Sequence, residues 1–85
     1  MYIYNSLIEE KEYGRVIVKL SEIMDRYGIS RNKLSQITGI KYSVIDRYYR
    51  AYNVERVDLN LLAKICYALE CNIDDILEYK VDFKK

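Results

Sequence analysis

Residues 31–48 read RNKLSQITGIKYSVIDRY, and this stretch decides the fold. Leu34 and Ile37 lie on one face of a short helix, which Gly39 ends after about two turns because glycine readily adopts left-handed backbone angles. Ser35 precedes the glycine by four residues, and its small side chain allows the next helix to cross closely. We therefore expect two short helices joined by a tight turn. The apolar face of the second helix consists of Ile40, Val44, Ile45 and Tyr48.

The same spacing of apolar residues predicts one helix before this stretch and another after it. The earlier helix begins at Leu20 and ends at Gly28, and Ser30 is a good N-cap for the helix that follows. Asp58 is the N-cap of the later helix. The apolar stripe of that later helix consists of Leu59, Leu62, Ile65, Cys66 and Leu69.

A short fifth helix is predicted near the C-terminal end. Asn72 caps it, and Asp74 and Asp75 lie in its first turn, where the helix dipole favours negative charge. Its buried side consists of Ile73, Ile76 and Leu77. The sequence therefore predicts an all-α fold, with five short helices around one core.

The chain divides into an N-terminal arm at residues 1–17, a helical domain at residues 18–78 and a polar, frayed tail at residues 79–85. The arm is expected to be extended or to form a hairpin. Its aromatic alternation at residues 2–4 and its β-branched run at residues 16–18 both fit short strands. A chain of 85 residues is long enough for one core only.

The charge is distributed unevenly along the chain. The overall net charge is +1, but residues 1–14 carry −2, residues 15–56 carry +5 and residues 57–85 carry −2. Basic charge thus gathers in the middle, where a nucleic-acid surface needs it. The sequence has no apolar run near the roughly 20 residues of a membrane helix and no signal-peptide pattern, so we expect a cytoplasmic protein without membrane contact.

Enzymatic and metal chemistry are not expected. The chain contains no histidine, the commonest general base and metal ligand. Cys66 and Cys71 are five residues apart, which matches no zinc or redox spacing, so they are interpreted as reduced core residues. Helix capping explains the adjacent acids Asp74 and Asp75. We predict neither a catalytic residue nor a metal site nor a cofactor.

The ten tyrosines are divided between core and surface. Tyr27, Tyr48 and Tyr67 are expected to fill helix edges in the core. Tyr42, Tyr49 and Tyr52 are expected to be exposed.

The pattern from Leu34 through Gly39 to Ile45, followed by LxxLxKIxxALxxNIxDIL at residues 59–77, resembles the Xre/Cro family of phage and bacterial repressors. The resemblance covers roughly Val18 to Leu77. It implies a lambda-repressor-like helix-turn-helix domain, which regulates transcription by placing one recognition helix in the major groove of double-stranded DNA.

The resemblance also implies roles for individual positions. In this family the start of the recognition helix and the residue one turn later touch bases. The corresponding residues here are Tyr42, Ser43 and Arg47. Phosphate contacts are implied for Arg31, Lys41, Arg50 and Arg56. Relatives often continue with Asn-Gly-Lys after the recognition helix, whereas this chain has RAYNVER at residues 50–56.

An acidic residue lies on or beside the reading face. Asp46 would repel phosphate unless it accepts a hydrogen bond from cytosine or pairs with Arg50, four residues later. The sequence leaves both alternatives open.

One such domain covers little DNA, so we expect a homodimer on a two-fold site, with the apolar arm and the fifth helix as dimer surfaces. The alternative is a protein-interaction module, such as an antitoxin-like domain under the control of a partner protein, with weak or no DNA binding. Single-stranded RNA binding through the tyrosines is disfavoured because the usual sheet platform is not predicted.

Overall fold

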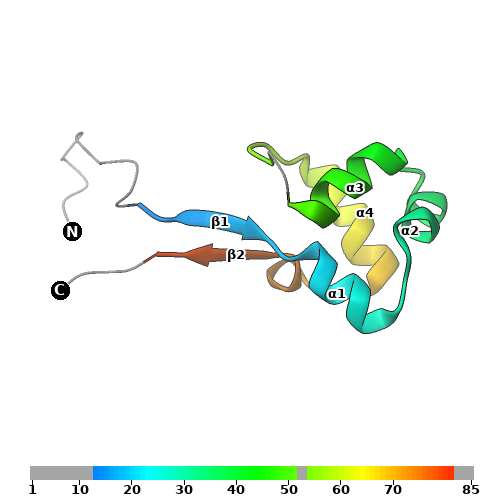
Figure 1. Cartoon of the computed structure of the whole chain (residues 1–85), viewed down its shortest axis with the longest axis horizontal. Coiled ribbons are helices and arrows are strands. Elements are labelled where there is room, and N and C mark those ends of the chain that lie inside the picture. The colour runs from blue at the N-terminus through cyan, green and yellow to red at the C-terminus, as the bar shows by residue number, and fades with distance from the viewer. Residues whose placement is uncertain (1–12, 52–53, 82–85) are drawn as a thin grey trace.

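The computed structural model describes residues 13–51 and 54–81, which form a small helical body with a projecting two-stranded ribbon (Figure 1). The elements in chain order are β1 (Arg15–Val18), α1 (Leu20–Tyr27), α2 (Arg31–Thr38), α3 (Tyr42–Arg50), α4 (Leu59–Leu69), the 3-10 helix η1 (Ile73–Asp75) and β2 (Leu77–Lys80). Helices α2 and α3 are the pair predicted from residues 31–48. No helix in these described ranges is long and apolar enough to cross a membrane.

The predicted helix ends are confirmed where a cap was recognised. Gly28 and Gly39 end α1 and α2 with φ angles of 69° and 76°. The Ser30 hydroxyl accepts a hydrogen bond from the Lys33 amide at 3.0 Å, and the Asp58 carboxylate accepts from the Asn60 amide at 2.9 Å. These side chains satisfy amides that the first turn of a helix leaves without a partner.

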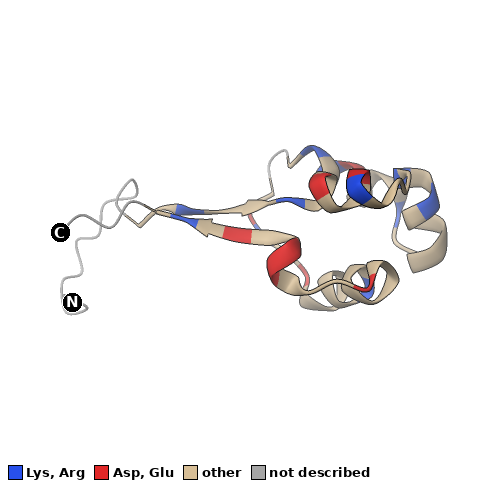
Figure 2. Cartoon of the chain, turned by 90° about the horizontal axis from the view of Figure 1, so that it is seen from below, with Lys and Arg blue, Asp and Glu red and all other residues tan. Residues whose placement is uncertain are grey.

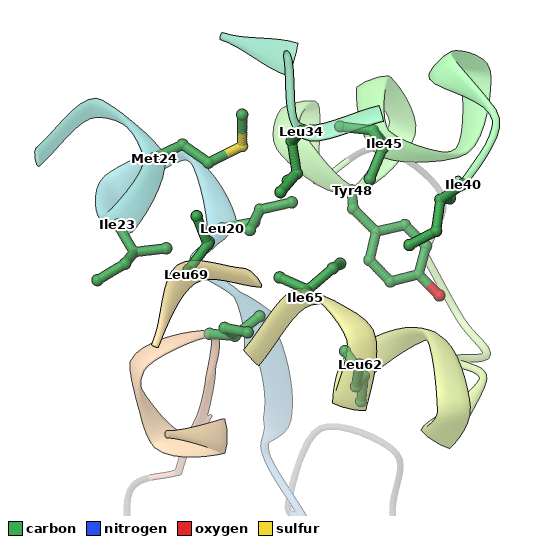
Figure 3. Close-up of a cluster of buried hydrophobic side chains, with 11 residues drawn as sticks. Leu20, Ile23, Met24, Leu34, Ile40, Ile45, Tyr48, Leu62, Ile65 and Leu69 are labelled. Atoms are coloured by element: carbon green, nitrogen blue, oxygen red, sulfur yellow. The ribbon is translucent and has the colours of Figure 1, made fainter. Parts of the chain in front are cut away.

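One hydrophobic core holds the helices together (Figure 3). Each of the four α-helices contributes buried side chains, and two more come from Ile40, in the turn between α2 and α3, and from Ile76, directly before β2. Burying such a side chain stabilises the fold by about 1.5–3 kcal/mol. The core residues are Leu20, Ile23, Met24, Leu34, Ile40, Ile45, Tyr48, Leu62, Ile65, Leu69 and Ile76.

The prediction of an all-α fold with five helices is wrong at the C-terminal end. In place of a fifth α-helix, the described chain has the single turn η1 followed by strand β2. Residues 77–80 read LEYK, an alternation with period two that fits a strand beside β1. Tyr79 and Lys80 therefore lie in a sheet and not in the polar, frayed tail predicted for residues 79–85. Residues 82–85 lie outside the described part.

The β-branched run predicted as a strand forms β1, and its partner is β2. The two strands are antiparallel, with Val16 opposite Tyr79 and Val18 opposite Leu77. The amide of Lys19 donates to the Ile76 carbonyl at 2.5 Å, which ties the ribbon to the core. The alternating run at residues 2–4 lies outside the described residues.

The tyrosines expected in the core do not all lie there. Tyr48 is buried as predicted, with 2% of its surface exposed, but Tyr27 and Tyr67 are 51% and 88% exposed. Tyr67 belongs to α4, whose core side is already filled by Leu62, Ile65 and Leu69, so its position on the helix directs it to solvent.

The tyrosines expected at the surface also divide. Tyr42 is exposed as predicted, whereas Tyr49 is half-buried and packs against the core. Tyr52 lies outside the described residues.

Gly14→Ala is predicted to open the ribbon. Gly14 has a φ of +75°, and a Cβ atom there would collide with the Lys80 carbonyl oxygen and the Val81 Cβ. Amide exchange of Ile17 and Glu78, which lie opposite each other in the ladder, should become faster, while helical core amides keep their protection. Gly28→Ala is the matched control: its φ is +69° but nothing lies within 4 Å of the added Cβ. It should cost about 1 kcal/mol of stability without affecting the ribbon. Unchanged exchange at Ile17 in Gly14→Ala would contradict this account.

Candidate nucleic-acid interface

The turn between α2 and α3 is fastened by hydroxyl groups. Ser35 Oγ donates to the Ile40 carbonyl at 2.6 Å, and Thr38 Oγ1 donates to the Leu34 carbonyl at 2.7 Å. Thr38 Oγ1 also accepts from the Ile40 amide at 3.2 Å. These bonds pair the polar groups of the turn at the point where the two helices approach each other.

Helix α3 has a buried side and an exposed side. Ile45 and Tyr48 are in the core, with 0% and 2% of their surface exposed. The three residues expected to touch bases all lie on the exposed side, and Arg47 makes no ion pair with any residue in the described ranges. These residues are Tyr42, Ser43 and Arg47. The exposure of these three side chains therefore agrees with the prediction from the sequence.

Asp46 joins α2 to α3 through two arginines. The guanidinium Nη1 of Arg31 lies 2.5 Å from Asp46 Oδ1, and Nε of Arg50 lies 3.0 Å from Asp46 Oδ2. The pairing with Arg50 is one of the two alternatives open from sequence. The bond to Arg31 spans 15 positions, and no local pattern in the sequence predicts it.

The electrostatics of this group favour the ionised carboxylate. Partial burial opposes ionisation of Asp46, but the hydrogen bonds and positive charges of Arg50 and Arg31 outweigh it. They hold the pKa of Asp46 below its ordinary value of 3.8. The carboxylate thus separates two cations that would otherwise repel each other on one surface.

Tyr49 extends the network to α1, a role that its position in the sequence does not predict. The Arg31 guanidinium lies over the Tyr49 ring, 4.6 Å from its centre, and the Tyr49 hydroxyl donates to Asp25 at 2.8 Å. That hydrogen bond to Asp25 raises the pKa of Tyr49 above 10.0. The first residue of α2 is therefore held by two residues of α3, one of which, Tyr49, is itself bonded to α1.

The fold brings together only two of the four residues that are expected to contact phosphate. Arg31 and Arg50 meet at Asp46, and Lys41 lies exposed at the N-cap position of α3. Arg56 is exposed in the segment before α4, where it makes no hydrogen bond or ion pair with another described residue. Figure 2 shows how the Lys and Arg positions are spread over the ribbon and helices.

A tight helix pair with an exposed basic second helix on a rigid core defines a helix-turn-helix DNA-binding domain. A model of the Cro/C1-type HTH DNA-binding domain family matches residues 19–82. The chain therefore belongs to the Cro/C1-type helix-turn-helix family. The resemblance stated from the sequence is confirmed.

Two relatives are regulators by name. The SPbeta prophage-derived uncharacterized HTH-type transcriptional regulator YopS of Bacillus subtilis (strain 168) is 34% identical over 71 residues, covering 84% of this chain and 92% of YopS. The uncharacterized HTH-type transcriptional regulator RP766 of Rickettsia prowazekii (strain Madrid E) is 29% identical, covering 95% of this chain and 96% of RP766. Family and relatives support the predicted function, DNA-binding transcriptional regulation.

Solved structures share the fold. The crystal structure of the transcriptional regulator VanUg superposes with a TM-score of 0.65 at 24% identity, covering 92% of this chain and 97% of VanUg. A protein from Bacteroides fragilis has the same TM-score at 14% identity and covers 75% of this chain and 100% of its own length. At these identities the likeness concerns the fold alone.

Asp46→Asn is predicted to lower stability at neutral pH, with an effect that disappears in acid. Because the pKa of Asp46 is lowered in the folded state, the ion pairs stabilise the fold above the unfolded-state pKa. That contribution is lost as the pH falls through the folded-state value, below 3.8. The difference in urea midpoint between the two proteins should be constant from pH 7 to about 5 and shrink below about pH 4. Glu55→Gln, which removes an exposed acid outside the helices that makes no ion pair with a described residue, is the control. A wild-type advantage that persists undiminished at about pH 2 would argue against the assignment.

Proposed function

We propose that α3 is the recognition helix of a sequence-specific transcriptional regulator and enters the major groove of double-stranded DNA. The observation that carries this proposal is the geometry of α3. The helix is locked from behind by Ile45 and Tyr48, while Ser43 and Arg47 project into solvent one helical turn apart. A B-DNA major groove about 12 Å wide admits such a helix.

The base-contacting residues differ in what they can recognise. Arg47 can donate two parallel hydrogen bonds to a guanine, which is worth about 1–3 kcal/mol of discrimination. Ser43 can donate to or accept from several bases. Tyr42, 46% exposed at the first position of α3, lies against a thymine methyl group or reaches a phosphate.

Phosphate contacts are assigned to the basic residues around α3. A guanidinium carries five N–H donors, so Arg31 and Arg50 retain donors for phosphate oxygens while they hold Asp46. Their pairing with Asp46 fixes the direction of both side chains before DNA arrives, which reduces the entropy lost on binding. The assigned phosphate-contacting residues are Arg31, Lys41, Arg50 and Arg56.

The regulator is proposed to act in the cytoplasm as a homodimer on a two-fold site. A dimer places two α3 helices on half-sites about one helical turn of DNA apart, roughly 34–36 Å. Each half-site then supplies its own base and phosphate contacts, and the two together give the specificity that one short helix lacks.

One observation favours a second function, the binding of a protein partner. An open groove of about 1120 Å³ lies between α2 and α4, away from the residues assigned to DNA. Its rim carries Ile37 and Tyr67, which are 49% and 88% exposed. Titration of labelled duplex DNA at two salt concentrations separates the two functions. A pure protein-interaction module would show no salt-dependent DNA binding.

Arg47→Ala and Arg31→Ala are predicted to weaken DNA binding in different ways. Loss of Arg47 should relax preference at one base position, with a cost of about 1–3 kcal/mol on the preferred duplex only. Loss of Arg31 should weaken all duplexes alike and reduce the slope of log K against log salt by about one. Both effects are measured by fluorescence titration against a site selected from a random pool of duplexes.

Lys64→Ala is the control for these variants, because Lys64 lines the groove beside α4 and is not assigned to DNA. It should bind the selected site as the wild type does. If Arg47→Ala and Arg31→Ala lose the same affinity on every duplex, the assignment of Arg47 to base reading is wrong.

A further inference from the structure

The two cysteines of the chain meet at the C-terminal end of α4. Glu70 follows the last residue of this helix with φ 51° and ψ 51°, and this left-handed conformation turns the chain back over the helix end. The Cys71 amide donates to the Cys66 carbonyl at 3.0 Å, and the Glu70 amide donates to the Tyr67 carbonyl at 3.3 Å. These two bonds form a Schellman motif, in which the side chains at the positions of Cys66 and Cys71 characteristically touch.

This turn explains why the spacing of the cysteines matches no known motif. Residues five positions apart in a continuous α-helix lie about 140° apart around its axis, so their side chains diverge. The left-handed residue Glu70 ends the helix and removes that separation. The approach of Cys66 to Cys71 is therefore a property of the folded helix end.

Both thiols can be reached from solvent. Cys66 and Cys71 are free thiols, each half-buried and packed against the core. Both line the open groove between α2 and α4. A small ligand in this groove can therefore contact two sulfur atoms at once.

The surroundings of the pair favour positive charge. The pKa of the Cys71 thiol is raised to about 11, chiefly by burial and next by the neighbouring Cys66. The negative charges of Asp75 and Asp74 act in the same direction. A thiol that keeps its proton at neutral pH is a poor nucleophile, which disfavours a catalytic role. The same two carboxylates favour a cation that takes the place of the proton on sulfur.

We propose that Cys66 and Cys71 form a two-sulfur site for one soft monovalent cation, of which Cu(I) is the biological example. On binding, the two thiols release two protons to solvent and two copper–sulfur bonds form. The metal remains Cu(I), so no electron is transferred. The site lies apart from α3, and the inference does not depend on the proposed contacts with DNA.

The number and kind of ligands identify the cation. Thiolates select Cu(I), zinc and iron–sulfur clusters. A structural zinc ion takes four protein ligands, and the clusters are held by four cysteines or by cysteines together with histidines. In residues 13–51 and 54–81, no group of three or more histidine, cysteine or acidic side chains is placed to hold a metal ion. Two thiolates satisfy Cu(I), which accepts linear coordination by two ligands.

The test is a titration of the full, reduced chain with Cu(I) under argon, in competition with a chromogenic Cu(I) chelator. The wild type should bind one Cu(I) per chain. Cys66→Ser and Cys71→Ser each leave one sulfur ligand. Each should weaken binding by more than the roughly 10–100-fold that loss of a group beside the metal ligands costs.

A second measurement shows whether the fold itself prepares the site. Because the folded chain holds the two thiols together, Cu(I) at about 100 times its dissociation constant should raise the thermal midpoint of the wild type by roughly 5 °C or more. The midpoints of both serine variants should not change. Zn²⁺ should leave the wild-type midpoint unchanged as well, since two ligands do not complete its coordination.

Lys64→Ala is the matched control, because Lys64 lines the same groove without a sulfur atom, and this variant should bind Cu(I) as the wild type does. Circular dichroism verifies that each variant is folded, and the wild-type stoichiometry and midpoint need no variant. The proposal is overturned if the wild type binds Cu(I) no more tightly than the serine variants. It is equally overturned if Cu(I) does not raise the wild-type midpoint, or if Zn²⁺ raises it as much.

Discussion

The close crossing of α2 and α3 at Gly39 is the constraint on which the rest of the structure depends. A backbone φ of 76° turns the chain there, and Ser35 and Thr38 pair the polar groups of the turn. With the backbone satisfied, Leu34 and Ile45 can be fully buried on the inner sides of the two helices. The exposed side of α3 is consequently determined by packing, and a surface that reads bases needs this fixed direction.

Electrostatics on that surface follow from the same crossing. Because the helices approach closely, Asp46 of α3 can reach Arg31 at the start of α2 as well as Arg50 on its own helix. An isolated exposed ion pair stabilises little, but this carboxylate binds two cations, one of which also stacks on Tyr49. The network orders basic side chains around Arg47 without neutralising Arg47 itself.

Local signals predicted the parts of the fold that depend on nearby residues. Ser30, Gly39 and Asp58 cap helix ends through contacts with residues only a few positions away, so these caps could be predicted from the sequence. The outward face of α3 could be predicted from the spacing of its apolar residues. The pairing of β1 with β2 joins segments about 60 residues apart, and the Arg31–Asp46 bond also depends on tertiary contact. The sequence-based prediction divided the LEYK run between the end of a helix and the start of a polar tail, because a four-residue alternation is too short to distinguish period two from period 3.6 without its partner strand.

The presence of β2 in place of the predicted fifth helix changes how two copies of the domain can be spaced. A fifth helix would have offered a helical dimer surface, whereas β2 leaves the core directly after Ile76, which is fully buried, and β1 enters α1 after Lys19 alone. The Lys19–Ile76 backbone bond joins these two exits. The ribbon is therefore attached to the same rigid core as α3 and not to a flexible linker. Any contact made through the ribbon sets the separation of two α3 helices through the fold itself, which is the condition for recognising half-sites at one fixed spacing.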